Sequence, residues 1–353
     1  MASSLNNPAW LEWMTTLMGE VSGPGVSRRS YAATLPPDRF YCLLDELPFH
    51  LIPQRAVRSL RLQENRDQSF YLNRECILCT AGQVPDELAS RKAQFSGFAL
   101  QGTMAWVRNP ATGNLLPFWL GPQLEDALQG LRPNEPVPSS VPMSARCLLA
   151  AAGLLLPEDR IDQRQHERED RVRQASTRFR EKGDAPLGDL IHPFHIAALR
   201  RYFRYLIRTG AMRLDDGQSP RRYVAYNEPV ARFFHHDIAA RLSAVAGESL
   251  KPSYVYLASY LGGAELKKHT DREQCEFSVT LCLDFSPELT LATPWPIRLD
   301  SPTGTGTVYQ ALGDGLAYRG TRLPHYRGLL GEGQTSTSIF FHYVAADFAG
   351  SLD

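Results

Sequence analysis

The stretch LKKHTDREQCEFSVTLCLDF, from Leu266 to Phe285, decides the fold of this chain. It places His269 and Asp271 two positions apart, and a strictly alternating run follows at once. Side chains on a strand point alternately to its two sides, so the run predicts one apolar packing face and one small polar face. The apolar face carries Phe277, Val279, Leu281, Leu283 and Phe285, and the polar face carries Ser278, Thr280, Cys282 and Asp284. Such a strand suits a sheet whose polar side lines a cavity.

The H-x-D pair is the clearest candidate for chemistry in the sequence. Residues two apart on an extended chain point the same way, so His269 and Asp271 can reach one ion. The third candidate is His325, in GDGLAYRGTRLPHYRGLL, which must come from a neighbouring strand. Two histidines and one carboxylate occupy one face of a ferrous ion and leave three coordination positions open. The sequence therefore predicts a metal site of His269, Asp271 and His325.

The surroundings of this pair favour an all-β core. The preceding SYVYLASYLGG alternates, with Tyr254, Tyr256 and Tyr260 on one face. Turn residues such as Gly262-Gly263 and Gly331 to Gly333 separate further short strands up to the last one, STSIFFHYV. Short strands spaced by turns predict a sandwich or barrel. His342 in the last strand shares parity with Ser338 and Phe340, which leaves open whether it lines the cavity or packs in the core.

Upstream of this core the chain changes texture twice. Residues 1–156 mix helical and strand signals, including an amphipathic helix expected at Ala9–Val21. Residues 157–185 are a charged connector of mixed sign, for which a solvated helix or a mobile link is expected. Residues 186–353 are expected to hold two support helices followed by the β-rich core. The fold class is thus α+β, with a mixed N-terminal region of unknown role.

Individual strands and helices are also expected before the β-rich core. GFALQGTMAWVRNPATGNLLPFWLG predicts two strands joined by a turn, and GPQLEDALQGL and SARCLLAAAGLLLP predict two short helices. Two longer helical segments, 192–210 and 225–247, are expected before the β-rich core, each closing at a glycine.

Composition narrows the class of protein. Among 353 residues, 43% are hydrophobic, which allows a sizeable core, and Lys+Arg and Asp+Glu both number 38. This balance gives no support to a nucleic-acid or membrane partner. The six cysteines show no disulfide framework and predict reduced thiols in a cytoplasmic protein. Cys76 and Cys79 form a single C-x-x-C, and without a second pair no structural zinc is expected.

Taken together, these motifs resemble the Fe(II)/2-oxoglutarate-dependent dioxygenases, particularly the prolyl-hydroxylase-like branch and its uncharacterised bacterial members. The resemblance covers roughly Lys251 to Ala346. It implies a double-stranded β-helix (jelly-roll) and iron held by His269, Asp271 and His325. It also implies that 2-oxoglutarate chelates the metal through its 2-oxo acid end and that O2 takes the last site. Decarboxylation to succinate would then drive oxidation of a C–H bond.

The far carboxylate of the cosubstrate needs a cation in such a pocket. Much of the family places an Arg or Lys about ten residues after the distal histidine, but EGQTSTS, from Glu332 to Ser338, holds neither. Arg327 is the expected substitute because it shares the parity of His325 on a strand, and Arg298 is the second choice. The resemblance also suggests Tyr260 as a cosubstrate contact, and Tyr254 and Tyr256 share its parity.

The substrate is expected to be a peptide, an amino acid or a natural product, and the reaction a hydroxylation. Desaturation and cyclisation stay open, as does the oligomeric state. A halogenase is not expected, because that variant replaces the carboxylate ligand and Asp271 is present. Two other interpretations are a cupin-like metalloprotein, although the G-x₅-H-x-H spacing is absent, and a non-catalytic jelly-roll binding module.

Overall fold

The structure is a computed structural model. It describes residues 35–47, 51–53, 69–109, 112–132, 134–157, 161–288 and 291–353. The helix expected at Ala9–Val21 lies outside these residues.

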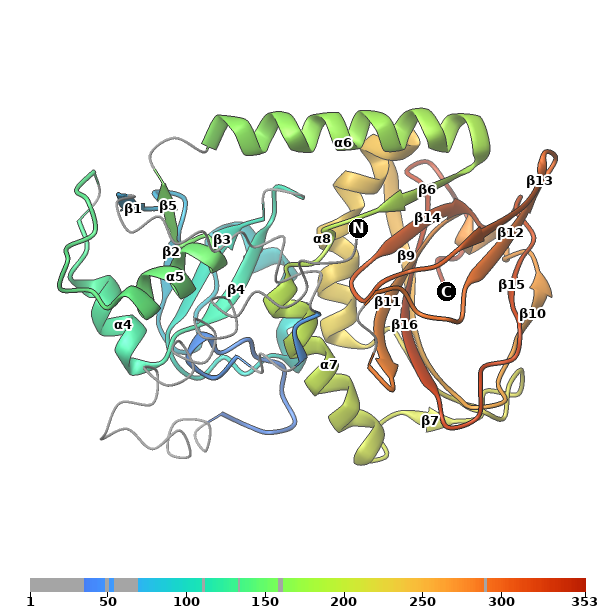
Figure 1. Ribbon diagram of the computed structural model, residues 1–353, viewed down its shortest axis with the longest axis horizontal. Helices are drawn as coiled ribbons and strands as arrows, with labels where there is room; N and C mark the ends of the chain where they lie inside the picture. Colours follow the sequence, from blue (N-terminus) through green and yellow to red (C-terminus); the bar gives the residue numbers. More distant parts are fainter. Residues whose placement is uncertain are drawn as a thin grey trace, which may run out of the picture.

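Within residues 250–345, described apart from 289–290, eight strands are divided between two facing sheets and alternate between them except at the β12–β13 hairpin (Figure 1). They are β9 (Leu250–Leu261), β10 (Leu266–His269), β11 (Phe277–Ser286), β12 (Ile297–Ser301), β13 (Gly304–Val308), β14 (Gly315–Arg319), β15 (His325–Arg327) and β16 (Thr335–Ala345). One sheet contains the order β14-β11-β16-β9 and the other the order β10-β15-β12-β13, with every pairing antiparallel. This division into two antiparallel sets of four strands is the topology of a double-stranded β-helix, and it confirms the predicted jelly-roll core.

Three shorter strands widen the larger sheet at its two edges. β6 (Asp184–Leu187) pairs with β14, and β8 (Arg222–Tyr226) pairs with β9 and carries β7 (Arg213–Leu214) outside it. The sheet therefore starts at Asp184, just before the expected start of the C-terminal region at residue 186. Because β8 pairs with β9, Arg222 at its start can reach the hydroxyl of Tyr260.

The two faces of β11 follow the predicted alternation from Phe277 to Leu283, but the prediction is wrong for Asp284 and Phe285. A register shift between Cys282 and Asp284 turns Asp284 toward Arg200 and Arg204 of helix α7 (Pro193–Arg208) and Phe285 into the interior cluster with Tyr260 and Trp295. The outer face, with Phe277, Val279, Leu281 and Leu283 of β11 and Phe341 and Tyr343 of β16, joins the main hydrophobic core.

Two helices cover this outer face: α7, whose N-cap His192 accepts a hydrogen bond from Phe194, and α8 (Pro229–Ala246). α8 ends at Gly247, which has φ 76° and provides the left-handed C-cap. Both support helices lie where they were expected, and the polar face is left to the barrel interior.

The N-terminal region is a mixed unit that shares this core. It contains η1 (Leu44–Glu46), β1 (Phe70–Leu72), β2 (Ile77–Cys79), η3 (Asp86–Gly97), β3 (Met104–Arg108), β4 (Leu115–Trp119), α4 (Pro122–Gln129), α5 (Met143–Ala152) and β5 (Leu155–Pro157). The expected β3–β4 hairpin and both short helices are confirmed. Aromatic rings join this unit to α8. For example, the ring of Phe98 packs edge-on against that of Phe233 on α8, with centroids 5.3 Å apart.

The charged connector forms one long helix, α6 (Ile161–Lys182), that runs along one side of the molecule past both parts (Figure 1). Its C-terminal end is anchored, because Phe179 is fully buried and stacks on Phe277 at 6.2 Å. Among the described residues, no helix is long and apolar enough to cross a membrane. The six cysteines are all in described segments and all are free thiols.

A buried carboxylate ties α8 to the β3–β4 turn. Asp237 is fully buried and accepts a hydrogen bond from Thr112 Oγ1 at 2.9 Å, and Asn114 donates to its backbone carbonyl at 2.8 Å. Its Oδ2 has no hydrogen-bond partner. Burial raises the pKa of Asp237 to about 6, although hydrogen bonds from Thr112 and Asn114 oppose the rise.

This carboxyl makes the stability of the fold depend on pH. Its pKa is higher in the folded state than in the unfolded chain, so the folded state holds more protons between about pH 4 and 6, and stability falls as pH rises through that window. Relative to the wild type, Asp237→Asn should gain about 2–3 kcal/mol of unfolding free energy between pH 4 and 7. Denaturant unfolding at several pH values measures this difference. An equal change in Asp126→Asn, an exposed carboxyl on α4, would contradict the assignment.

Candidate metal centre

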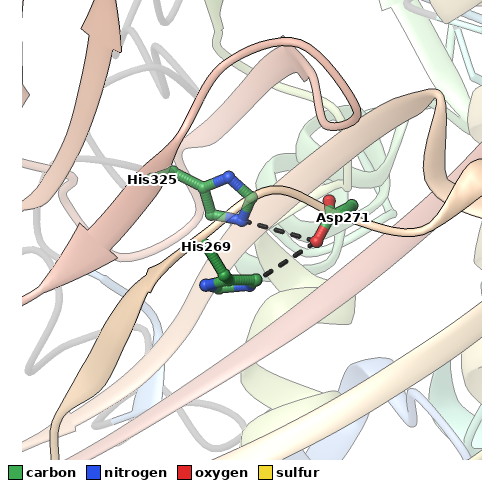
Figure 2. Close-up of side chains that lie close together, drawn as sticks. All are labelled: His269, Asp271 and His325. Atoms are coloured by element: carbon green, nitrogen blue, oxygen red, sulfur yellow. Dashed lines mark ion pairs between the residues drawn. The ribbon is translucent and has the colours of Figure 1, made fainter.

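Three side chains converge at one end of the smaller sheet (Figure 2). His269 ends β10 and His325 begins β15, and the two are register partners across the sheet. Asp271 follows β10, where its backbone N–H donates to Gly320 at 2.9 Å. One carboxylate oxygen, Oδ1, lies 3.6 Å from His269 Nε2 and 3.5 Å from His325 Nε2. The ligand atoms of the three residues all lie within 4.8 Å of one another, so a single ion can contact all three.

Backbone carbonyls set the orientation of both imidazoles. His269 Nδ1 lies 2.7 Å from the carbonyl of Lys267, and His325 Nδ1 lies 3.0 Å from that of Leu323. A carbonyl can only accept, so the proton of each neutral imidazole belongs on Nδ1. Each Nε2 then carries a lone pair and faces Asp271. This is the tautomer that a metal ligand needs, held by the kind of outer contact common around metal sites.

The electrostatics of the cluster favour a cation. Burial raises the pKa of Asp271, but His269 and His325, which can also carry a proton on the Nε2 facing the carboxylate, outweigh it and hold the pKa well below its usual range. The Asp271 carboxylate in turn raises the pKa of His269. The side chain of His269 is 40% exposed, whereas that of His325 is only 3% exposed. The centre therefore opens to solvent on the side of His269.

Two residues that the sequence did not single out as site residues complete the packing around Asp271. Ser278 Oγ lies 3.1 Å from Asp271 Oδ2, on the side away from the imidazoles. Gly320 packs so closely that a Cβ there would lie 2.3 Å from Asp271 Oδ2 and 2.4 Å from the carbonyl of Cys275. Ser278 was visible only as a member of the polar face of β11. Nothing in the sequence marked Gly320, because its neighbours come from another strand.

Deeper in the barrel, Arg327 is a buried cation with no anionic partner. It shares the inner face of β15 with His325, as parity predicted, and it is 4% exposed. Nη1 donates to the carbonyl of Trp295 at 2.6 Å and Nη2 donates to Gln310 Oε1 at 3.0 Å, while Nε has no partner. Among the described residues, no carboxylate lies within ion-pairing distance of it. Burial lowers the pKa of Arg327, which reflects the cost of a charge held there without a counter-ion.

Two further buried hydroxyls on the inner face lack hydrogen-bond partners. They are Thr280 Oγ1 of β11 and Ser338 Oγ of β16. Gln310 links this face to Arg327, because its Nε2 donates to the carbonyl of Thr280 at 3.0 Å while its Oε1 accepts from Arg327. Buried polar atoms in native proteins nearly always have a hydrogen-bond partner. The unpartnered atoms of this interior could therefore form hydrogen bonds with a polar ligand.

The other predicted cosubstrate residues differ in their placement. Tyr260 is buried against Trp295, with ring centroids 5.0 Å apart, and its hydroxyl accepts from Arg222 at 3.2 Å. Tyr256 donates to Asp216 at 2.5 Å, and the Tyr254 hydroxyl lies 2.9 Å from Cys275 Sγ.

Arg298 lies on the other face of β12, with its guanidinium 5.9 Å from the ring of Tyr326. The structure therefore brings Tyr260 to the interior beside Trp295 and Arg327 and leaves Arg298 outside. Arg222 of β8, which the sequence did not single out, reaches the mouth of the barrel. It forms an ion pair with Asp216, and its charge acts on His269.

Comparisons with known proteins find similarity at the level of the fold. No family model matches the chain, and no curated protein matches it. Among solved structures, the 2-oxoglutarate-dependent epimerase SnoN from nogalamycin biosynthesis aligns with a TM-score of 0.43 and 15% identity, over 50% of this chain and 82% of its own. A prolyl-4-hydroxylase from Pseudomonas putida aligns with 0.40 and 14%, over 48% and 98%.

HygX from Streptomyces hygroscopicus, solved with nickel, 2-oxoglutarate and hygromycin B, aligns with a TM-score of 0.41 and 13% identity, over 50% of this chain and 88% of its own. Because identity is low and half of the chain is aligned, its function is inferred below from its own side chains.

The close approach at Gly320 gives a test of the centre. Gly320→Ala should lower the affinity for a divalent ion such as Co(II) by at least about 10-fold, because the new Cβ displaces Asp271 or Ser278. Calorimetric titration of the purified protein measures the affinity. Gly306→Ala, where the nearest atom to a Cβ lies 3.8 Å away, should bind Co(II) like the wild type. Unchanged affinity in Gly320→Ala would mean that Asp271 is not a ligand.

Proposed function

We propose that this protein is an Fe(II)- and 2-oxoglutarate-dependent oxygenase that hydroxylates an unactivated C–H bond and releases succinate and CO2. Its substrate is a peptide, an amino acid or a natural product. One observation carries the proposal: a cluster of two imidazole Nε2 atoms and one carboxylate oxygen lies at the barrel mouth, and a buried, unpaired arginine follows two residues after the second histidine.

The donor set suits ferrous iron. His269, Asp271 and His325 supply two nitrogens and one oxygen to one face of an octahedral ion, and three positions stay open. A 2-oxo acid and O2 would bind at the positions that these three residues leave free. When bound, the iron and its cosubstrate supply the coupling of O2 reduction to oxidative decarboxylation. The chain's own contribution is to hold the metal, orient the cosubstrate and present the substrate at the side where His269 is exposed.

The interior suits the far end of 2-oxoglutarate. A buried guanidinium without a counter-ion is costly, and a carboxylate placed against it offsets that cost through charge-assisted hydrogen bonds. The free Nε of Arg327 is available to donate, as are the hydroxyls of Thr280 and Ser338. Arg327 therefore takes the place of the cation missing from residues 332–338. A cupin-like protein or a passive scaffold would have no use for an unpaired cation at this depth.

The remaining expectations follow from this function. The free thiols suit a reducing compartment, and we place the protein in the cytoplasm. The role of residues 1–156 is proposed to be a contribution to substrate recognition.

The function is tested by adding Fe(II) and 2-oxoglutarate to the protein without oxygen and recording the visible charge-transfer band of the chelate. Oxygen is then admitted and succinate is measured. The wild type should give both signals, and His269→Ala should give neither. Iron binding without a band or succinate would contradict the cosubstrate assignment and favour the cupin-like interpretation. Absence of iron binding would favour the binding module.

Replacing Arg327 should affect the binding of 2-oxoglutarate and the stability of the fold in opposite directions. Arg327→Met should raise the dissociation constant for 2-oxoglutarate by about 30-fold or more, which corresponds to about 2 kcal/mol. Quenching of Trp295 fluorescence measures binding, because Arg327 lies 5.0 Å from that ring. The stability of the ligand-free protein should hold or increase, since an unpaired buried charge is removed.

Arg298→Met is the matched control for this substitution. Its side chain lies on the other face of the same sheet, so its cosubstrate affinity should stay within about threefold of the wild type. A large loss in Arg298→Met with none in Arg327→Met would reverse the assignment of the anchor.

A further inference from the structure

Ser278 is a buried hydroxyl with more contacts than it has protons. Its Oγ is fully buried and lies 3.1 Å from Asp271 Oδ2, 2.9 Å from His342 Nδ1 and 3.3 Å from the carbonyl of Cys275. Ser278 and His342 are register partners on the adjacent strands β11 and β16. The contact is therefore fixed by the larger sheet and does not depend on a loop.

Counting hydrogens gives the direction of this network. An ionised carboxylate and a backbone carbonyl both only accept, and Asp271 Oδ2 at 3.1 Å is nearer and more strongly charged than the Cys275 carbonyl at 3.3 Å, so Ser278 donates its single proton to Asp271. Its oxygen can then only accept from the ring, so His342 Nδ1 carries a hydrogen and donates. The result is a one-way chain from the His342 ring through the Ser278 hydroxyl to the outer oxygen of Asp271.

We propose that Ser278 and His342 are positioning residues that hold Asp271 as a one-oxygen ligand of the metal. This inference rests on the metal centre of the proposed function. Oδ1 lies nearly equally far from the two imidazoles, whereas Oδ2 is turned to Ser278. With Oδ2 engaged, the carboxylate occupies one coordination position instead of two.

The number of positions matters for the reaction. An octahedral ion with two imidazoles and a one-oxygen carboxylate keeps three positions open, which the 2-oxo acid and O2 require. A carboxylate that binds through both oxygens would leave two, and cosubstrate and O2 could not bind together. The hydroxyl of Ser278 thus protects the third position by keeping Oδ2 hydrogen-bonded.

The surroundings hold this chain in place. The His342 ring lies 4.6 Å from that of Tyr254 and is stacked parallel to Phe340 at 6.5 Å. Asp271, Cys275 and His342 also lie close enough to suggest a second metal site. However, Cys275 Sγ is engaged by the Tyr254 hydroxyl, and Ser278 bonds both His342 and Asp271. These groups satisfy one another, which favours a positioning role.

The test uses Co(II) binding to the purified full-length protein, followed by calorimetry and visible absorption. Ser278→Ala should bind Co(II) about 10- to 100-fold more weakly, and its cobalt spectrum should change because the carboxylate is free to bind through both oxygens. His342→Phe keeps the ring and removes the donor, so it should shift both readouts in the same direction by a smaller amount. The affinity of the cobalt-loaded Ser278→Ala protein for 2-oxoglutarate should also fall.

Ser259→Ala is the matched control, because it removes another buried hydroxyl, from β9, that accepts from Thr337 at 2.9 Å. Its cobalt affinity and spectrum should equal those of the wild type. Denaturant unfolding of the metal-free proteins shows whether each variant is folded; if Ser278→Ala is not, His342→Phe decides.

The outcomes distinguish a failure of the proposed metal centre from a failure of the positioning role. If the wild type binds no Co(II), the metal centre itself is contradicted. A wild type that binds, with Ser278→Ala and His342→Phe indistinguishable from Ser259→Ala, overturns the positioning role alone. A thiolate-to-cobalt charge-transfer band in the wild type would also overturn it, because that band would place Cys275 on the metal.

Discussion

The carboxylate of Asp271 is shared between two imidazoles on one side and a hydroxyl on the other, and the surrounding structure is arranged to permit this. β10 and β15 pair so that His269 and His325 meet in register. Their Nδ1 atoms are occupied by backbone carbonyls, which leaves both Nε2 atoms to face one oxygen. Gly320 gives the space in which Asp271 and Ser278 approach each other. A charge cluster of this kind is stable only with a cation or with protons in its centre.

The larger sheet uses one face for the stability of the fold and the other for the polar interior of the barrel. Its apolar face packs against α7 and α8 and supplies the burial that stabilises the fold. Its inner face carries hydroxyls, and with Arg327 of the facing sheet it presents buried polar atoms that the protein itself does not satisfy. Leaving Nε of Arg327 and two hydroxyls without hydrogen-bond partners lowers stability, and this local loss lies where the proposed cosubstrate would bind.

The alternation of residues along the sequence was sufficient to predict to which side of a strand most of the site residues point. The alternation of β11 as far as Leu283, the common direction of His269 and Asp271, and the inward direction of Arg327 all follow from a period of two, and the structure confirms them. The reversal of Asp284 and Phe285 was missed, because a period of two does not reveal the register shift after Cys282. The contacts of Ser278 and Gly320 could not be predicted, because they depend on which residues oppose them on β16 and after β14. Arg222 was missed because β8 joins the sheet only through tertiary pairing. In the N-terminal region, the hairpin and short helices were predictable, but their packing on α8 through Asp237 was not.

The most direct measurement is a crystal structure of the protein prepared without oxygen, with Fe(II) and 2-oxoglutarate bound. The account predicts one iron held by Nε2 of His269, Nε2 of His325 and a single oxygen of Asp271. It also predicts the far carboxylate of 2-oxoglutarate against Arg327, with Thr280 and Ser338 in hydrogen-bond contact. Iron bound elsewhere, or a cosubstrate whose far carboxylate lies away from Arg327, would contradict it.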